Sequence, residues 1–280
     1  MIALGLATIL TGAFAVIVRF GQRRGGDLHT IGVANYLTAS LAFIPLLRLH
    51  PSPVVSHHTL LLGAIGGLVY ATAYYLFLPV MSSRGVAIGS AVTRVSVVLP
   101  MLLSLGVWRE APTWVQAIGA ALALAALPLL VLSRLDGQPS PPRSREFALL
   151  AALFLFNGGC LSVGKWYHAT GNLAERPAYF ATLFGVAALY TGAVWVVRSQ
   201  RLDALDVLTG ALLGLTNASS NFALLSALDA FPGVVTFPVT AAGGLVLAVV
   251  FAAIWWKELP TRLGAVGVLL AVLAVVLVNL

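Results

Sequence analysis

The chain has 280 residues, of which 60% are hydrophobic and 9% are charged, and its formal net charge is +7. A soluble domain carries about 25% charged residues, so this composition excludes an ordinary soluble enzyme or binding module and indicates an integral membrane protein. The basic residues lie in short segments between apolar blocks, so the positive charge does not indicate nucleic-acid binding.

Ten apolar blocks of roughly 18–22 residues follow one another, each long enough to cross about 30 Å of hydrocarbon as a helix. We predict them at 2–19, 30–48, 59–81, 86–107, 113–133, 147–167, 178–198, 207–227, 233–256 and 262–280. Membrane-spanning strands would alternate apolar and polar residues in segments of about ten, and that alternation is absent. The predicted fold class is therefore an all-α integral membrane protein with ten transmembrane helices.

Polar residues inside the second and third blocks are the first candidates for a binding site. Asn35 and Tyr36 lie about five residues into the second block, and Tyr70 and Tyr74 share one face of the third. A row of aromatic side chains on a helix is either packing or the wall of a cavity. Because a phenol hydroxyl needs a hydrogen-bond partner, the tyrosines favour a cavity that contains water.

Arg94 lies about eight residues into the fourth block, roughly 12 Å deep at 1.5 Å per residue. An arginine at the centre of a membrane helix costs about 2.5–3.5 kcal/mol on insertion scales. In the internal repeat described below, the equivalent position holds Ala242, so the fold does not require a charge there. Arg94 is either an anchor for a substrate carboxylate or phosphate, through its planar guanidinium, or a brace on backbone carbonyls.

The eighth block carries a stripe of small and polar residues. Gly210 and Gly214 allow close approach of another helix, while the side chains of Asn217, Ser220 and Asn221 can hydrogen-bond either a substrate or a neighbouring helix. In the ninth block, Thr236 and Thr240 share a face, although threonine also bonds back to its own helix. The residues predicted to line the substrate site are Arg94, Asn35, Tyr36, Tyr70, Tyr74, Asn217, Ser220, Asn221 and Thr240.

Charges elsewhere are expected near the membrane surfaces. Lys165 lies close to the end of the sixth block, where a lysine is expected to extend to the interface, and no Asp or Glu lies deep in any predicted block. Proton-coupled exporters of organic cations commonly use a membrane carboxylate. The sequence therefore disfavours that class and favours anionic, zwitterionic or uncharged solutes. The one cysteine, Cys160, excludes an internal disulfide and a cysteine-based metal cluster. No metal or other cofactor is expected.

A six-residue segment occurs twice. Trp-Arg-Glu-Ala-Pro-Thr at 108–113 corresponds to Trp-Lys-Glu-Leu-Pro-Thr at 256–261, an offset of 148 (258 − 110). We interpret both copies as turns rather than catalytic segments. Thr113 can cap the following helix with Gln116 as its capping-box partner, and Glu110 is expected to pair with Arg109 or with a nearby helix N-terminus.

The proline-rich segment 134–146 is the predicted linker between the repeats 1–133 and 147–280. Each repeat contains five predicted helices. Because five is odd, the second repeat must cross the membrane in the opposite sense to the first. Inverted repeats are the geometry used for alternating access, with the substrate site near the membrane midplane.

Two five-helix halves, each with an apolar fourth helix, the Trp-basic-Glu-x-Pro-Thr turn and a fifth helix rich in Gly, Ala and Leu, resemble the EamA-type branch of the drug/metabolite transporter superfamily. The segment Ser90–Pro100 is also similar to bacterial members. The resemblance implies a ten-helix carrier in the cytoplasmic membrane, whose cavity is lined by helices 1–4 and 6–9 while helices 5 and 10 lie outside. It does not identify the substrate, because members move amino acids, nucleobases, sugars, nucleotide sugars and drugs.

Basic residues predict the orientation. The segments after helices 1, 3, 5, 7 and 9 hold eleven: Arg19, Arg23, Arg24, Arg84, Arg134, Arg143, Arg145, Arg198, Arg201, Lys257 and Arg262. Those on the other side hold four: Arg48, Arg109, Lys165 and Arg176. The positive-inside rule then places both termini outside the cytoplasm, in contrast to the superfamily's usual arrangement.

The predicted function is that of a membrane transporter, an exporter or exchanger of small polar metabolites such as amino acids or organic anions. Its expected partners are a small-molecule substrate and the lipid bilayer, and its expected state is a monomer or weak homodimer. A non-transporting helical scaffold or receptor would not explain the duplication. An intramembrane lipid-modifying enzyme would need a convergent catalytic constellation, which the sequence does not present.

Overall fold

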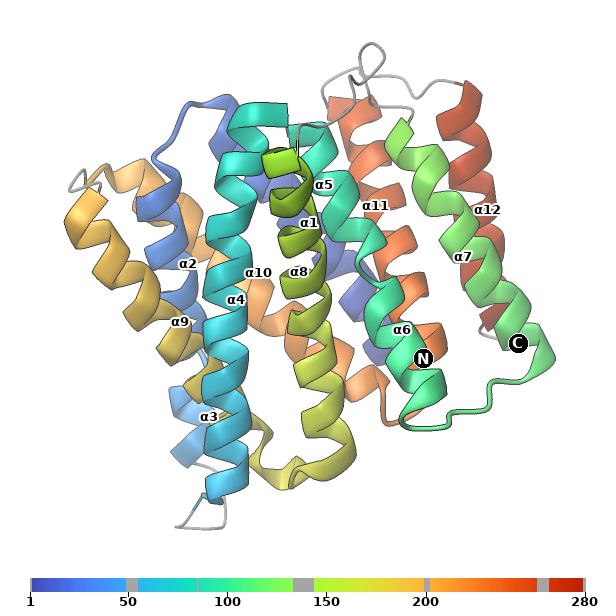
Figure 1. Ribbon diagram of the computed structural model, residues 1–280, viewed down its shortest axis with the longest axis horizontal. Coiled ribbons are helices and arrows are strands. Elements are labelled where there is room, and N and C mark those ends of the chain that lie inside the picture. The colour runs from blue at the N-terminus through green and yellow to red at the C-terminus, as the bar shows by residue number, and fades with distance from the viewer. Residues whose placement is uncertain are drawn as a thin grey trace.

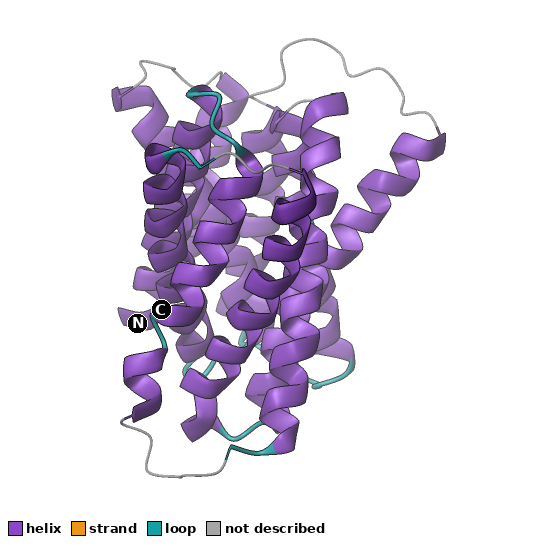
Figure 2. Cartoon of the chain, turned by 90° about the vertical axis from the view of Figure 1, so that its left-hand side faces the viewer, coloured by secondary structure: helices purple, strands orange, loops and turns teal. Residues whose placement is uncertain are grey.

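The computed structural model describes residues 2–48, 55–84, 86–132, 144–198, 202–255 and 262–278, and all regular elements within these ranges are helices (Figures 1 and 2). The first half contains α1 (Ile2–Arg23), α2 (Leu28–Leu41), α3 (Ile44–Arg48), α4 (His57–Arg84), α5 (Val86–Val95), α6 (Val98–Gly106) and α7 (Trp114–Leu132). The second contains α8 (Ser144–Thr170), the 3₁₀ turn η1 (Leu173–Glu175), α9 (Arg176–Arg198), α10 (Ala204–Ala227), α11 (Gly233–Trp255) and α12 (Arg262–Val278).

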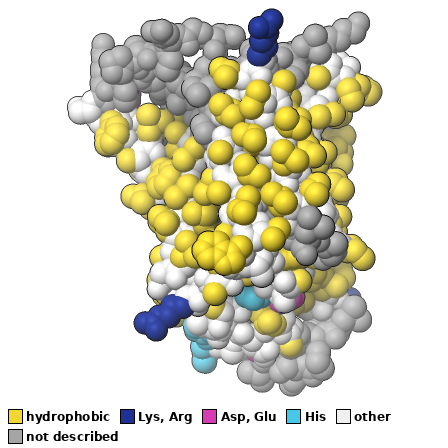
Figure 3. Space-filling view, turned by 90° about the vertical axis from the view of Figure 1, so that its right-hand side faces the viewer, with side chains coloured by type: hydrophobic (Ala, Val, Ile, Leu, Met, Phe, Trp, Pro, Cys, Tyr) yellow, Lys and Arg dark blue, Asp and Glu magenta, His cyan; other side chains and the backbone are white. Residues whose placement is uncertain are grey.

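The helices form an all-α membrane protein, as the composition predicted. Six helical segments are long and apolar enough to cross a membrane: 2–23, 28–48, 57–80, 144–170, 173–198 and 233–255. Shorter apolar helices occupy 92–106, 114–126 and 265–274. Figure 3 shows hydrophobic side chains over the middle of one face and basic side chains toward its two ends. Each of the ten predicted blocks coincides with a helix or a broken helix, and the count of ten spans stays a prediction.

Two blocks that we expected to be single helices are broken by proline. A proline lacks the backbone N–H and its ring clashes with the carbonyl four residues earlier. Pro45 is four residues after Leu41, where α2 ends, and Pro100 is four residues after Ser96, just beyond the end of α5. The equivalent positions of the second half, Ala193 and Ala248, lie inside the continuous helices α9 and α11.

The two halves interlock. The helix that opens each half packs against the other half: α1 contacts α10 and α11, and α8 contacts α4, α5 and α6. The remaining central contacts pair α2 with α9 and α10, and α4 with α9. Outside this core, α7 and α12 lie side by side and run in opposite directions, so α12 ends near the start of α7 (Figure 1). The start of α1 and the end of α12 therefore lie toward the side of the bundle opposite the end of α7 and the start of α8 (Figure 1).

Glycines set the closest approaches between these helices, as predicted for α10. A Cβ at Gly214 would lie 2.3 Å from the backbone oxygen of Asn35 in α2, and one at Gly210 would lie 2.6 Å from that of Ile31. Real Cβ atoms do not approach a backbone oxygen so closely, so α2 and α10 contact each other through bare backbone. Asn35 and Asn217 are thereby brought to opposite sides of one helix interface.

The turns agree with the sequence where the structure describes them. The predicted capping box before α7 is confirmed, because the Thr113 N–H donates to Gln116 Oε1 at 3.2 Å and the Gln116 N–H donates to Thr113 Oγ1 at 3.3 Å. Residues 133–143 of the predicted linker and the second copy of the turn, 256–261, lie outside the described residues. α8 begins at Ser144, three residues before the predicted start of the sixth helix, and the division into two repeats joined by the linker 134–146 stays a prediction.

Candidate functional site

A hydrogen-bonded chain of polar side chains crosses the interior between α2, α4 and α10. The Asn217 Nδ2 donates to Asn35 Oδ1 at 3.3 Å, and the Asn221 Nδ2 donates to Asn217 Oδ1 at 2.8 Å. The Tyr70 hydroxyl donates to Asn221 Oδ1 at 2.6 Å, and the Tyr36 hydroxyl donates to the Tyr70 carbonyl at 3.3 Å. Five of the nine predicted site residues, from both halves of the chain, therefore meet in one network.

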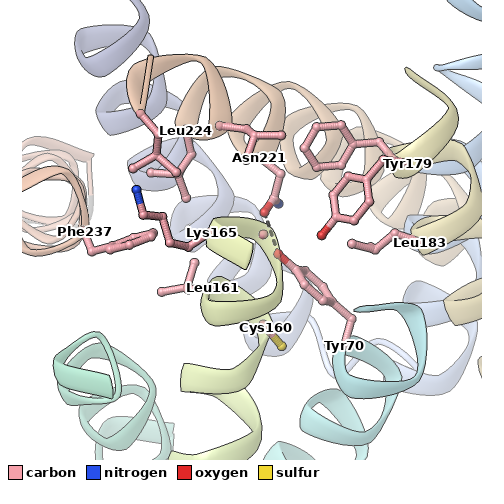
Figure 4. A pocket seen from close by; sticks show the side chains of 13 residues that line it. Tyr70, Cys160, Leu161, Lys165, Tyr179, Leu183, Asn221, Leu224 and Phe237 are labelled. Carbon is pink, nitrogen blue, oxygen red and sulfur yellow. Dashed lines mark hydrogen bonds between the residues drawn. The ribbon is translucent and has the colours of Figure 1, made fainter. Parts of the chain in front are cut away.

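A pocket lies directly beside this network (Figure 4). The polar groups on its wall come from Tyr70 on α4, from Cys160 and Lys165 on α8, from Tyr179 on α9 and from Asn221 on α10. The rest of the wall is leucine, phenylalanine and glycine: Leu161, Gly164, Phe180, Leu183, Leu224, Leu225, Leu228 and Phe237. We call it the Lys165 pocket. Its lining combines an apolar surface with a few converging polar groups, and its free space of about 20 Å³ in this conformation holds about one water molecule.

Lys165 is buried, with 4% of its surface exposed, so the expectation that it extends to the membrane surface is wrong. Its ammonium forms an ion pair with Glu110 and lies 5.8 Å from the centre of the Trp108 ring. The physical reason is the turn at 108–113, which supplies a carboxylate and an aromatic face below the surface. The Glu110 Oε2 also accepts a hydrogen bond from the N–H of Val234, at 3.2 Å, in the first turn of α11.

This pairing corrects two expectations from the sequence. Glu110 contacts a helix N-terminus, as predicted, but its cationic partner is Lys165 rather than the adjacent Arg109. Arg94 is also not alone as an ionisable residue inside the helical bundle, because Lys165 lies there as well. The repeated turn therefore does more than reverse the chain, since its first copy places a negative charge against the wall of the pocket.

The remaining four predicted site residues form their hydrogen bonds outside the central network, although the Tyr74 ring packs edge-on against that of Tyr36. The Tyr74 hydroxyl donates to the carbonyl of Leu28, and the Ser220 hydroxyl shares a 3.0 Å hydrogen bond with that of Thr11 on α1. The Thr240 hydroxyl donates back to Thr236 and Phe237 of its own helix. Arg94 is half-buried in the last turn of α5, where it already interacts with another group of the protein.

The break after Arg94 is capped from the other half. Residues 96 and 97 separate α5 from α6, and Asn157 on α8 donates to the carbonyl of Thr93 at 2.9 Å and to Ser96 Oγ at 2.6 Å. Backbone carbonyls freed inside a membrane must find a partner in the protein. Asn157 supplies one, so it holds the broken helix against α8 and fixes the backbone around Arg94.

A second pocket shares three of its eleven lining positions with the first at the 148-residue offset. It is lined by α1, α2, α4 and α10, and includes Ile17, Ile31 and Phe77. These three correspond in the repeat to Lys165, Tyr179 and Leu225 of the first pocket (165 − 148 = 17, 179 − 148 = 31, 225 − 148 = 77). We call it the Ile17 pocket. Its polar side chains are those of Gln22, Tyr74 and Thr209.

Sequence reasoning missed Lys165, Tyr179 and Glu110. A signal for Lys165 was present, because its repeat equivalent is the apolar Ile17, which indicates that the position lies within the apolar length of the helix. The structure adds that α8 continues to Thr170, so Lys165 lies more than one turn inside the helix. No pattern in the sequence indicated a role for Tyr179, whose position against the pocket follows from the packing of α9.

Comparison with known proteins agrees with this architecture. The family model described as the EamA-like transporter family matches residues 1–132. This match places residues 1–132 in the family, within the drug/metabolite transporter superfamily. A solved structure titled only "Crystal structure of protein" superposes with a TM-score of 0.75, covering 99% of this chain and 94% of that one at 14% identity. That likeness shows the shared fold alone. No curated protein matches the chain.

Membership in the EamA-like family makes the chain a membrane transporter by fold and confirms the resemblance found in the repeated turns. The match extends over α1 to α7, which contribute Asn35, Tyr36 and Tyr70 to the polar network. The Lys165 pocket itself draws mostly on α8 to α11.

Proposed function

We propose that this EamA-like protein is an exporter or exchanger of small polar metabolites, such as amino acids or organic anions, in the cytoplasmic membrane. The observation that carries the proposal is the buried network from Asn35 to Tyr36, which joins both halves and borders a pocket. Polar side chains inside a membrane bundle are costly unless they serve a solute path or each other. The carrier is active as a monomer or weak homodimer.

The proposed mechanism is alternating access between inverted repeats, 1–133 and 147–280, joined by residues 134–146. Support comes from α7 and α12, which occupy the same position in the two repeats and run in opposite directions (Figure 1). Further support comes from the first helix of each repeat, which packs against the other repeat: α1 against α10 and α11, and α8 against α4, α5 and α6. Rocking of one interlocked half against the other would open the central network to each side in turn.

Arg94 is proposed to set the charge preference of the substrate. It lies next to the broken backbone between α5 and α6, and its repeat equivalent is the fully buried Ala242. The planar guanidinium binds a carboxylate through two hydrogen bonds, which Lys at the same position cannot reproduce. Together with Ser220, Thr240 and Tyr74, Arg94 completes the nine residues that we propose as the substrate path.

Counterflow in liposomes tests the carrier proposal. Protein loaded with one unlabelled solute at a time, from a panel of amino acids, organic acids, nucleobases and sugars, should accumulate the matching labelled solute. Asn221→Leu should reduce counterflow roughly ten- to a hundredfold, because the Tyr70 hydroxyl loses its acceptor, which costs about 1–3 kcal/mol. Ser226→Ala on the same helix is the control, since that hydroxyl bonds only within α10. Wild-type counterflow by Asn221→Leu would contradict the role of the network.

The proposed orientation places both termini outside the cytoplasm. With Lys165 buried, the basic residues on the terminal side fall from four to three, against eleven on the other side. A reporter that is active only in the cytoplasm should remain inactive when fused after Leu280. An active fusion would restore the superfamily's usual orientation and leave the carrier proposal intact.

A further inference from the structure

Lys165 gives the wall of its pocket a positive charge that the architecture does not need. The equivalent residue in the Ile17 pocket is aliphatic, and the same packing of helices accommodates it. A buried ion pair is often no more stable than a well-packed apolar pair of similar volume. The stability of the fold therefore does not explain why Lys165 and Glu110 form an ion pair here.

The hydroxyl of Tyr179 is a second hydrogen-bond donor on the wall of this pocket. Its residue is 1% exposed, and its hydroxyl has no hydrogen-bond partner in the part of the chain that the structure describes. Figure 4 shows this hydroxyl pointing toward Tyr70 and Asn221, into the pocket. Gly164 leaves the facing wall open, since a Cβ there would still lie 4.0 Å from the hydroxyl. A buried phenol without a partner is costly, so an acceptor is expected at this place.

The remaining lining restricts the shape and polarity of a ligand. Leucine and phenylalanine side chains from α8, α9, α10 and α11 cover most of the wall, and none of the residues along this pocket is acidic. Glu110, the carboxylate against this wall, is already paired with Lys165, so a ligand ammonium would have to compete with the lysine for it. The lining therefore favours a compact apolar group that carries one anionic acceptor, and because the free space is about 20 Å³, the pocket must widen to admit it.

We propose that the Lys165 pocket binds a small organic acid with an apolar body, whose carboxylate replaces that of Glu110 on Lys165 and accepts a hydrogen bond from Tyr179. This inference rests on the proposed carrier function and names its substrate class. In the structure the Lys165 ammonium lies across the pocket from Tyr179 (Figure 4), held by Glu110. The four-carbon stem of lysine is flexible, so the ammonium swings into the pocket when a ligand carboxylate is present.

The position of Glu110 allows a ligand carboxylate to displace it from its ion pair with Lys165. Its side chain is 15% exposed, whereas that of Lys165 is 5% exposed, so the displaced carboxylate can reach water. It also keeps the N–H of Val234 at the start of α11 as a partner. Binding of the acid therefore exchanges one carboxylate for another on Lys165 and leaves neither charge buried without a partner.

The test compares phenylacetate with phenylacetamide, which share a shape and differ in charge, by titration of the purified full-length protein. Wild-type protein should bind the acid more tightly. Lys165→Met should abolish this preference, and Tyr179→Phe should weaken binding of the acid several-fold. Glu110→Gln should tighten binding of the acid about tenfold, because the resident counterion no longer competes. Asp206→Asn is the matched control at the separate ion pair with Arg24, and should not change the acid-to-amide ratio.

Opposite effects of Lys165→Met and Glu110→Gln are the distinguishing result, because an ion pair that only holds the fold would be weakened by either change. Equal binding of the two probes by wild-type protein, or effects of the same sign in the two variants, would overturn the proposal. If Lys165→Met does not fold, the direction of change in Glu110→Gln decides. Counterflow of neutral solutes alone would preserve the carrier proposal and reject the acid, whereas absence of all counterflow would reject the carrier.

Discussion

The Lys165 pocket and the Ile17 pocket share three lining positions at the 148-residue offset, yet they differ in chemistry. Lys165 and Tyr179 in the first are replaced by Ile17 and Ile31 in the second. Duplication of the chain thus duplicates the packing of helices, while single side chains decide which copy can bind a polar group. The comparison teaches that the backbone symmetry of the bundle predicts where cavities lie and says nothing about what they bind.

The surroundings of the pockets differ in the same way. The first half breaks its fourth segment at Pro100, and the second half, with Ala248 at that position, keeps α11 continuous. Asn157 caps the break, whereas its repeat equivalent, Ile9, is 58% exposed on the outside of the bundle. The break between α5 and α6 in the first half is thus matched by a polar side chain from the second. Four predictions test whether the two halves differ in this way.

Breaking the helix interfaces beneath the pockets should have the largest effect. Gly214 and Gly66 are repeat equivalents, and they contact Asn35 and Leu183, which are also equivalents (183 − 148 = 35). Gly214→Ala would place a Cβ 2.3 Å from a backbone oxygen, while Gly66→Ala meets the flexible end of Leu183 at 2.8 Å. We expect a loss of about 2–3 kcal/mol or more for Gly214→Ala and under about 1 kcal/mol for Gly66→Ala. Thermal unfolding in detergent measures both, and equal losses would contradict the contrast.

Removing the cap on the broken helix should have the next largest effect. Asn157→Leu leaves the Thr93 carbonyl and the Ser96 hydroxyl without the amide that binds them, and should destabilise the protein by about 1–3 kcal/mol. Ser162→Ala on the same helix removes only a hydroxyl bonded back to Gly158, so it serves as the control with an effect below about 1 kcal/mol. A drop in melting temperature confined to the control would show that the break needs no cap.

Water should distinguish the two pockets directly. In a background with Cys160→Ala, cysteine at Tyr70 or Asn221 should react with a small water-soluble thiol reagent, and a transported solute should slow the reaction. Cysteine at Ile17 or Ile31 should react at least several-fold more slowly, because three polar side chains line that pocket, against five in the Lys165 pocket. Mass spectrometry of the labelled protein follows each rate. Equal rates at both sites would mean that the polar network is packing rather than a solute path.

The smallest expected effect is the dependence of stability on pH through Asp229, at the end of the bundle nearest the Lys165 pocket. Burial alone would raise the pKa of Asp229, but hydrogen bonds from Arg176 and His168 hold that pKa below the ordinary value of 3.8. Deprotonated Asp229 therefore stabilises the fold above pH 3.8, and this contribution is lost as the pH falls through the lowered pKa. Asp229 is 42% exposed, so solvent screens the effect. Asp229→Asn should slightly flatten the acid limb of a melting-temperature profile, and an unchanged slope would contradict the pairing.

The sequence by itself determined the membrane class, the positions of the helices and their duplication. These features follow from local causes: runs of apolar residues long enough for a bilayer, turn residues such as Pro112 and Thr113, and a repeat visible at a constant offset. It also identified Asn35, Tyr70 and Asn217 as site candidates, because polar side chains are conspicuous among apolar ones.

Only the tertiary structure decided which polar groups meet. Lys165 was expected at the surface because its position near a helix end is a local property, while its burial depends on a turn 55 residues away in the chain that brings Glu110 to it. Tyr179 carries no sequence signal at all, and its hydroxyl matters only because α4, α9 and α10 converge on one pocket. Charge pairing and cavity lining depend on distances between segments remote in sequence, and helix packing alone sets those distances.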